Sequence, residues 1–221
     1  MVFPFLILNS WCNYMDVILS TERIDLQECD LLVTGFFEDE RPLRGSSGWV
    51  DWRLNGLLSN FLIEKRLIGG WKEMTLIPSQ GRMTPRMILL IGLGKVKEYS
   101  YLRLREICFY LSETLRRLRA SNVCLSFPYE EDYNVDCGKL AEVLIEGIAD
   151  YLDSNQNPPN EEWIKGLRLF FAEGEEPLPE ILLGIQTAKS ILENRIKIRV
   201  FTSSEETVNS ENPEFRNQYP E

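Results

Sequence analysis

The sequence predicts an α/β protein, a three-layer α/β/α sandwich with a mixed sheet, and three observations support this fold class. Short apolar runs, typical of buried strands, alternate with longer amphipathic patterns, typical of helices. Breakers rich in glycine and proline separate these segments, as in SQGRMTP at 79–85 and EGEEPLP at 173–179. With 221 residues, of which 44% are hydrophobic, the chain is long enough to bury a substantial core.

The strand-like runs are nearly continuous in apolar residues, which is typical of strands buried on both faces. Two pairs of runs follow each other without a helix between them, one near the N-terminus and one around residues 79–85. These pairs predict antiparallel hairpins, so the sheet is expected to be mixed. The runs cover residues 16–20, 30–37, 73–78, 87–92, 123–127, 166–171 and 196–202.

The helical patterns place apolar residues three and four positions apart. In the clearest of them, Leu104, Ile107, Leu111 and Leu115 form one stripe, and Ser100 stands ahead of it as a cap. Helices on both faces of the sheet complete the predicted layers. The four patterns cover residues 48–65, 101–119, 136–152 and 178–192.

The two ends of the chain differ from this central part. Residues 1–15 contain an apolar stretch that has no basic residues before it and is too short to span a bilayer. Because Met15 directly precedes a strand-like run, these residues are interpreted either as an N-terminal extension or as the result of a misassigned start codon. Residues 203–221 are polar, acidic and poor in aliphatic side chains, which predicts a disordered tail. One folded domain is therefore expected over residues 16–202.

Composition excludes several classes of function. The net charge of −10 argues against a main role in binding nucleic acid or anionic membranes. Residues 1–129 carry 16 basic and 14 acidic side chains, and residues 130–221 carry 8 and 20, so the acidity belongs to the C-terminal part. There is no histidine, which excludes histidine-dependent triads and dyads. The five cysteines form no CxxC pair, so the sequence predicts no metal site, no cofactor and a reducing cytoplasm.

Two glycine-rich segments are candidate ligand-binding turns. The first follows a strand-like run and contains Gly92, Gly94 and Lys95; the second precedes a helical pattern. Backbone amides at such turns can bind anions. The favoured alternative is structural, since the first segment lacks a third glycine opening a helix and the second resembles a flexible connector. The second segment consists of Gly45, Ser46, Ser47 and Gly48.

Three stretches, at residues 30–43, 48–81 and 86–127, together resemble the N-terminal domain of the leucine aminopeptidases of the M17 metallopeptidase family. The most specific part is the unit that runs from IGLGK into a long helix beginning LR. The resemblance extends over roughly residues 16–200 and implies a macro-domain-like fold. The catalytic residues of that family lie in a separate C-terminal domain with an NTDAEGR-type motif, which this sequence lacks. No catalytic residue is therefore carried over.

The leading hypothesis is a stand-alone, non-catalytic domain, not an enzyme, that binds, regulates or assembles. Its partner would be a second copy or a separate peptidase subunit. The alternative is a macro-like module that binds ADP-ribose or a related nucleotide. Nucleic-acid contact through the basic residues of 95–119 is disfavoured against a solvated helix face, and no membrane partner is expected. Trp49, Trp52 and Trp71 are the candidate self-association surface.

Overall fold

The computed structural model describes residues 14–154, 163 and 166–202. They form a seven-stranded sheet in the order β3-β4-β2-β5-β6-β1-β7. Only β3 runs antiparallel to its neighbour, and the other neighbouring pairs are parallel, so the predicted mixed sheet is confirmed. The strands are β1 (Tyr14–Ser20), β2 (Leu31–Phe36), β3 (Met74–Pro78), β4 (Met87–Gly92), β5 (Asn122–Ser126), β6 (Arg168–Ala172) and β7 (Lys197–Thr202).

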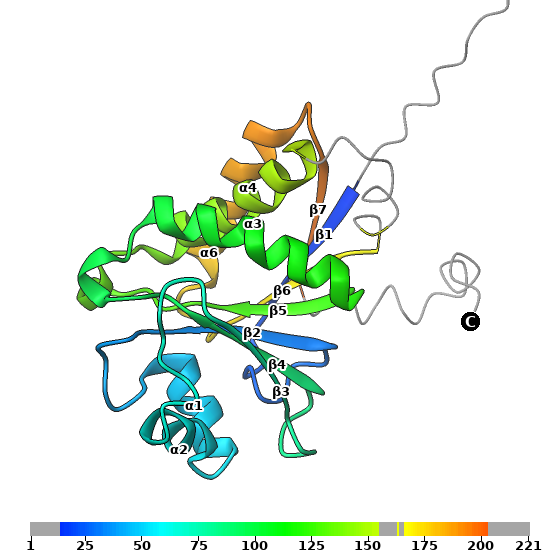
Figure 1. Cartoon of the computed structure of the whole chain (residues 1–221). Helices are drawn as coiled ribbons and strands as arrows, with labels where there is room; N and C mark the ends of the chain where they lie inside the picture. Colours follow the sequence, from blue (N-terminus) through cyan, green and yellow to red (C-terminus); the bar gives the residue numbers. More distant parts are fainter. Residues whose placement is uncertain (1–13, 155–162, 164–165, 203–221) are drawn as a thin grey trace, which may run out of the picture.

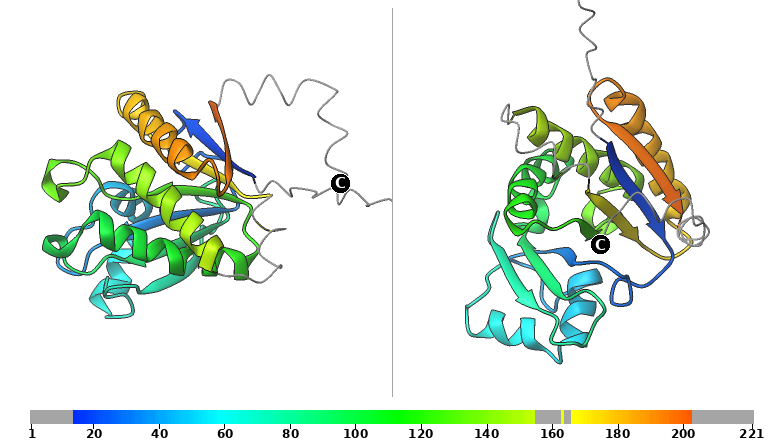
Figure 2. Two further views of the ribbon diagram at one scale, coloured as in Figure 1. Left: turned by 90° about the horizontal axis from the view of Figure 1, so that it is seen from above. Right: turned by 90° about the vertical axis from the view of Figure 1, so that its right-hand side faces the viewer.

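Helices cover both faces of this sheet, which confirms the three-layer prediction (Figure 1). The longer helices α3, α4 and α6 lie on one face, and α1 and α2 lie on the other, beneath β2 and β4 (Figures 1 and 2). Within the described residues, no helix is both long and apolar enough to cross a membrane. The helices are α1 (Gly45–Arg53), α2 (Leu57–Ile63), α3 (Tyr101–Leu118), α4 (Cys137–Ser154) and α6 (Leu178–Leu192).

The predicted N-terminal hairpin is wrong. β1 pairs in parallel with β6 and β7 and does not neighbour β2. Five of its seven residues are buried, and a strand covered on both faces gains most between two neighbours. The connection after β1 is long enough to allow this, and it carries a tight turn in which Leu26 and Gln27 donate to the Arg23 carbonyl. β1 also begins at Tyr14, two residues before the predicted strand. Residues 1–13 and 203–221 lie outside the described part.

The predicted helix over 48–65 is two helices. Asn55 and Gly56 both adopt left-handed backbone, with φ of 56° and 76°, and end α1 before α2 begins. The Asp51 carboxylate then accepts hydrogen bonds from the Leu58 and Ser59 amides at 2.8 and 3.0 Å, which caps α2. The sequence did not reveal this break, because apolar residues at helical spacing continue on both sides of Asn55 and Gly56.

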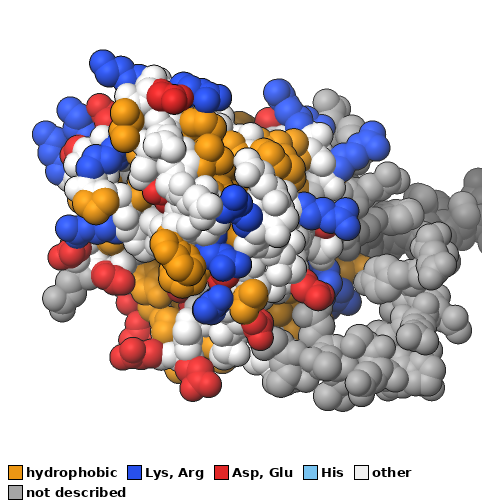
Figure 3. All heavy atoms as spheres, turned by 90° about the horizontal axis from the view of Figure 1, so that it is seen from below, with side chains coloured by type: hydrophobic (Ala, Val, Ile, Leu, Met, Phe, Trp, Pro, Cys, Tyr) orange, Lys and Arg blue, Asp and Glu red, His pale blue; other side chains and the backbone are white. Residues whose placement is uncertain are grey.

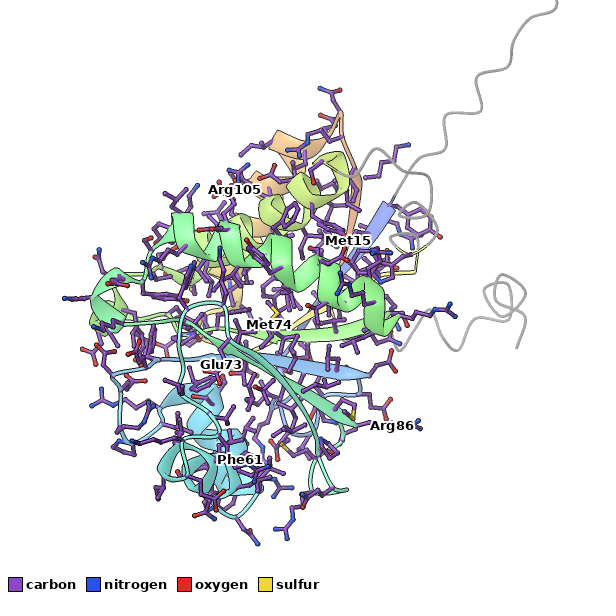
Figure 4. All side chains as sticks on the ribbon, in the orientation of Figure 1. Met15, Phe61, Glu73, Met74, Arg86 and Arg105 are labelled. Carbon is purple, nitrogen blue, oxygen red and sulfur yellow. The ribbon has the colours of Figure 1, made fainter. Side chains whose placement is uncertain are left out.

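The sheet separates two apolar cores. The larger lies under α3, α4 and α6 and includes Met15, labelled in Figure 4. The smaller lies against α1 and α2 and includes Val50 and Leu58. Helices α4 and α6 touch at backbone level, because a Cβ on Gly184 would lie 1.9 Å from the Gly138 carbonyl oxygen. This contact fixes the first turn of α4 beside α6, at the edge of the sheet where the strands end.

Candidate functional site

The candidate site is the crest, by which we mean the edge of the sheet where the parallel strands end. Loops after β1, β2, β5 and β6 meet there, and such edges are where open α/β sheets bind ligands. Three cavities open on the crest, with volumes of about 360, 170 and 680 Å³. We call them the Trp49 cavity, the Glu173 cavity and the Cys137 cavity. Gly45, Ser46 and Glu173 line both of the first two, which therefore adjoin.

Glu173 is the central polar group of the crest. It directly follows β6, and its amide donates to the Ser20 carbonyl at the end of β1 at 3.1 Å. Its carboxylate accepts hydrogen bonds from Ser126 Oγ at 3.2 Å and Tyr129 Oη at 3.1 Å. Ser46 Oγ in turn shares a hydrogen bond with Ser126 Oγ. Burial raises the pKa of Glu173 above its ordinary value, although the two hydroxyl donors oppose the shift.

The wall of the Trp49 cavity is held rigidly from behind. Trp49 Nε1 donates to Asp25 Oδ1 at 3.0 Å, and the Asp25 side chain is completely buried. Arg23 and Arg53 pair with the other oxygen of Asp25 at 3.1 and 3.2 Å. Trp52 lies beside Trp49, with ring centroids 4.8 Å apart. A buried carboxylate that accepts from the indole and forms ion pairs with two guanidinium groups fixes the orientation of the indole.

The Cys137 cavity is lined at one end by a group of possible metal ligands. One ligand atom each of Asp136, Cys137 and Glu180 lies within 4.8 Å of the other two. Asp136 is already used as the cap of α4, accepting from the Lys139 amide at 2.7 Å. Burial, and then the hydrogen bond to Glu180, raise the pKa of Cys137 to about 12, so the thiol is protonated near neutral pH. A metal ion would have to displace this proton in order to coordinate the sulfur.

The second glycine-rich segment lies on the crest. Gly45 and Ser46 open α1 and line two of the cavities. Ser47 is buried, and its hydroxyl donates to the Arg44 carbonyl at 3.0 Å. Gly48 packs on the chain itself, since a Cβ there would lie 2.6 Å from the Leu43 carbonyl oxygen. Of the four predicted residues in this segment, two face a cavity and two shape the start of the helix.

The first glycine-rich segment is closed by the chain itself. The amides of Gly92, Leu93 and Gly94 donate to the carbonyls of Glu73, Phe36 and Gly69 at 2.7, 2.9 and 2.9 Å. Gly92 touches the neighbouring loop so closely that a Cβ would lie 2.1 Å from the Gly70 oxygen. Neither Gly92, Gly94 nor Lys95 lines the three crest cavities. The geometry at this turn matches the structural alternative.

The neighbouring loop, residues 68–73, binds the carboxylate of its own Glu73. The carboxylate of Glu73, labelled in Figure 4, accepts from the amides of Ile68, Gly69 and Gly70, at 2.7 Å for Gly69 and 3.1 Å for Gly70. Consecutive amides of this kind are the groups that bind phosphates in other proteins. Here a side chain of the chain occupies them.

The structure also shows where the three tryptophans of the candidate self-association surface lie, and how the basic residues of 95–119 are paired. Trp71 packs with the larger core, whereas Trp49 packs with the smaller one, so the sheet separates them. Trp52 is 63% exposed on α1. Seen from below, the molecule shows hydrophobic and basic side chains side by side on its surface (Figure 3). Several arginines of 95–119 pair with acidic groups, as Arg105 does with Glu146 and Asp150. Such pairs are consistent with a solvated helix face.

Sequence reasoning did not single out Glu173, Tyr129 or the Trp49–Asp25 pair. One signal was available for Glu173, because a charged residue directly after a buried strand lies at the carboxyl end of that strand. The Trp49–Asp25 contact joins α1 to the turn after β1, 24 positions away, and leaves no local pattern.

Comparison with known proteins places the chain. The family model of the N-terminal domain of the cytosol aminopeptidase family matches residues 33–156. The chain belongs to this family. A probable cytosol aminopeptidase of Sulfurihydrogenibium sp. is 23% identical over 134 residues, which are 61% of this chain and 26% of that protein. One from Cyanothece sp. is 26% identical over 134 residues, 61% of this chain and 27% of that protein. The chain thus spans about a quarter of the length of these relatives.

Solved structures confirm the fold. A mutant tomato leucine aminopeptidase matches 80% of this chain and 37% of its own, with a TM-score of 0.56 and 16% identity. A Trypanosoma brucei macrodomain solved with ADP-ribose matches 77% of this chain and 68% of its own, with a TM-score of 0.58 and 12% identity. The chain therefore has a macrodomain-like fold, as the resemblance implied.

Proposed function

We propose that this chain is a non-catalytic accessory domain that binds, regulates or assembles with a peptidase and does not itself cleave peptides. The observation that carries the proposal is the extent of the family match. It covers the N-terminal domain of the cytosol aminopeptidases, in a chain that spans about a quarter of its relatives. The names of these relatives also support a cytoplasmic location, which suits the free thiols of Cys29, Cys108, Cys124 and Cys137.

The chemistry of the crest supports the same proposal. Hydrolysis by a pair of metal ions requires several ionised ligands that clamp the attacking and leaving oxygens. Among the described residues, the Asp136, Cys137 and Glu180 group is closest to such an arrangement, but Asp136 caps α4 through the Lys139 amide and Cys137 donates to Glu180 at 3.2 Å.

The test is an aminopeptidase assay of the purified chain on leucine p-nitroanilide with added zinc or manganese. A full-length cytosol aminopeptidase such as the Cyanothece relative serves as the positive control. We expect no turnover above the uncatalysed rate, and robust turnover that follows the chain through purification contradicts the proposal. Sedimentation of the chain alone, and mixed with that aminopeptidase, then reports self-association or assembly with a peptidase.

A second candidate function is a macro-like module that binds ADP-ribose or a related nucleotide. The position of the cavities favours it, because they open at the carboxyl ends of the parallel strands. The charges of their walls oppose it, since Glu22, Glu130, Asp132 and Glu173 repel a diphosphate. Calorimetric titration with ADP-ribose tests this function, and the absence of both heat and a thermal shift excludes it.

A further inference from the structure

We propose that the adjoining Trp49 and Glu173 cavities bind an organic ammonium group carried on an apolar or aromatic body. The two cavities share Glu173 as a common wall and differ in character on either side of it. The inference goes beyond the proposed function and does not depend on assembly with a peptidase. Three features of the cavities favour such a ligand: the apolar surface of one cavity, the hydrogen-bonding capacity of Glu173 and the sign of the wall charges.

The Trp49 cavity supplies the apolar part of the site. Ile24, Trp49 and Ala172 contribute to its wall, and its volume of about 360 Å³ falls at the lower end of the range for small-molecule pockets. The indole does not have to be ordered by the ligand, because Asp25 and its two arginines already hold it. A preformed aromatic wall lowers the entropic cost of binding. Arg23 already lies over this ring, with its guanidinium carbon 5.3 Å from the ring centroid, so the indole offers the ligand apolar contact and the ammonium group is left to Glu173.

Glu173 supplies the polar part. An ionised carboxylate has about four acceptor positions, and the described contacts of Glu173 use two of them, for Ser126 and Tyr129. The remaining capacity borders both cavities. The ligand group that suits it is a hydrogen-bond donor with a positive charge. Such a donor also offsets the cost of holding this carboxylate in a poorly solvated place.

The other charges in the walls favour the same ligand. Four carboxylates, those of Glu22, Glu130, Asp132 and Glu173, face two guanidinium groups, those of Arg23 and Arg44. Arg23 pairs with Asp25 behind the wall at 3.1 Å, and Arg44 pairs with Asp132 of the same wall at 3.6 Å. Among the described residues, Glu22, Glu130 and Glu173 then remain as wall carboxylates with no ion pair to an arginine or a lysine. The field in the cavities is therefore negative, which attracts an ammonium group and repels a phosphate or a free carboxylate.

The test compares three probes of similar shape and different charge by calorimetry near neutral pH. They are 2-phenylethylamine, 2-phenylethanol and 3-phenylpropionate. We expect the amine to bind at least about tenfold more tightly than the alcohol, and the propionate to give no heat. ADP-ribose is the fourth titrant. Its binding in preference to the amine overturns the inference, as does the absence of any heat with the amine at about 10 mM.

Three variants locate the site. Glu173→Gln removes the charge but keeps the size, and we expect it to weaken the amine at least about tenfold and leave the alcohol unchanged. Trp49→Leu should weaken the amine and the alcohol alike. Glu64→Gln, on an exposed residue at the end of α2, is the matched control and should bind as the unmodified chain does. Unchanged affinity of the amine for the Glu173→Gln variant contradicts the inference, and circular dichroism verifies that each variant is folded.

Discussion

Two glutamates at the same edge of the sheet are held in opposite ways. Glu73 is surrounded by amide donors of its own loop, which support the turn at Gly92. Glu173 borders two cavities, and burial raises its pKa. A carboxylate that is fully used inside the protein stabilises the fold, whereas one held in a cavity costs stability unless a ligand meets it. The difference teaches that the first glycine-rich segment, at Gly92 and Gly94, forms a structural turn, whereas the two cavities beside Glu173 open elsewhere on the crest.

The largest expected effect tests whether the turn at Gly92 is closed. Gly92→Ala places a Cβ 2.1 Å from the Gly70 oxygen, which is a backbone atom that cannot move alone. We expect a loss of about 3 kcal/mol in the free energy of unfolding, or failure to fold. Chemical denaturation measures it. Gly70→Ala is the matched control, because a Cβ there meets nothing within 4 Å, and it should change stability by less than about 0.5 kcal/mol.

The second prediction concerns the anion inside the closed turn. Glu73→Gln leaves the amides of Ile68, Gly69 and Gly70 with a weaker acceptor. Since hydrogen bonds to a charged group are worth about 1.5 to 3 kcal/mol each in favourable cases, we expect a loss of about 2 kcal/mol at pH 7. Thermal unfolding checks it. Faster amide hydrogen exchange at Gly69 should accompany the loss, and an unchanged melting temperature means that the carboxylate does not hold the turn.

The third prediction is a gain in stability, whereas the first two are losses. The pKa of Glu173 is raised by burial, so between its ordinary value of 4.5 and its folded value the native state binds more protons than the unfolded chain. Stability therefore falls as pH rises through that window and stays lower above it. Glu173→Gln removes this cost. We expect the variant to be more stable by about 1 kcal/mol at pH 7, with the advantage disappearing below pH 4.5 in urea denaturation. A variant that is less stable at pH 7 refutes the contrast with Glu73.

The smallest expected effect comes from Glu113, a partly exposed carboxylate that pairs with Arg116 and Arg117. It shows how little a surface ion pair contributes compared with Glu73 and Glu173. Arg116, then Tyr151 and Arg117, hold the pKa of Glu113 at about 2. A lowered pKa contributes stability that is complete above the unfolded value of about 4.5 and is lost as pH falls toward 2. Because solvent screens this pair, Glu113→Gln should cost only about 0.5 kcal/mol at pH 7. The difference from the unmodified chain should vanish near pH 2 in the same denaturation series.

Much of the fold could be predicted because its signals are local. The apolar run at 87–92 and the stripe at 178–192 coincide with β4 and α6. The position of β1 could not be predicted, because its partners β6 and β7 are distant in sequence. In the candidate site, Gly45 and Ser46 could be predicted because a glycine–serine turn ahead of a helix is a local signal. Glu173 could not be predicted as a site residue, because its role depends on hydrogen bonds from Ser126 and Tyr129, which are distant in sequence.

The order of the strands has a consequence for how the protein is made. Of the described strands, β1 is synthesised first, yet within the described residues it pairs only with β6 and β7. The backbone hydrogen bonds of β1 to β6 and β7 cannot all form until the chain has been synthesised to about residue 202. β2, β4 and β5 can meet earlier, so translation should produce a half-built sheet with an unpaired edge. Until the last strands arrive, the unpaired edge of this partial sheet is open to pairing with another chain.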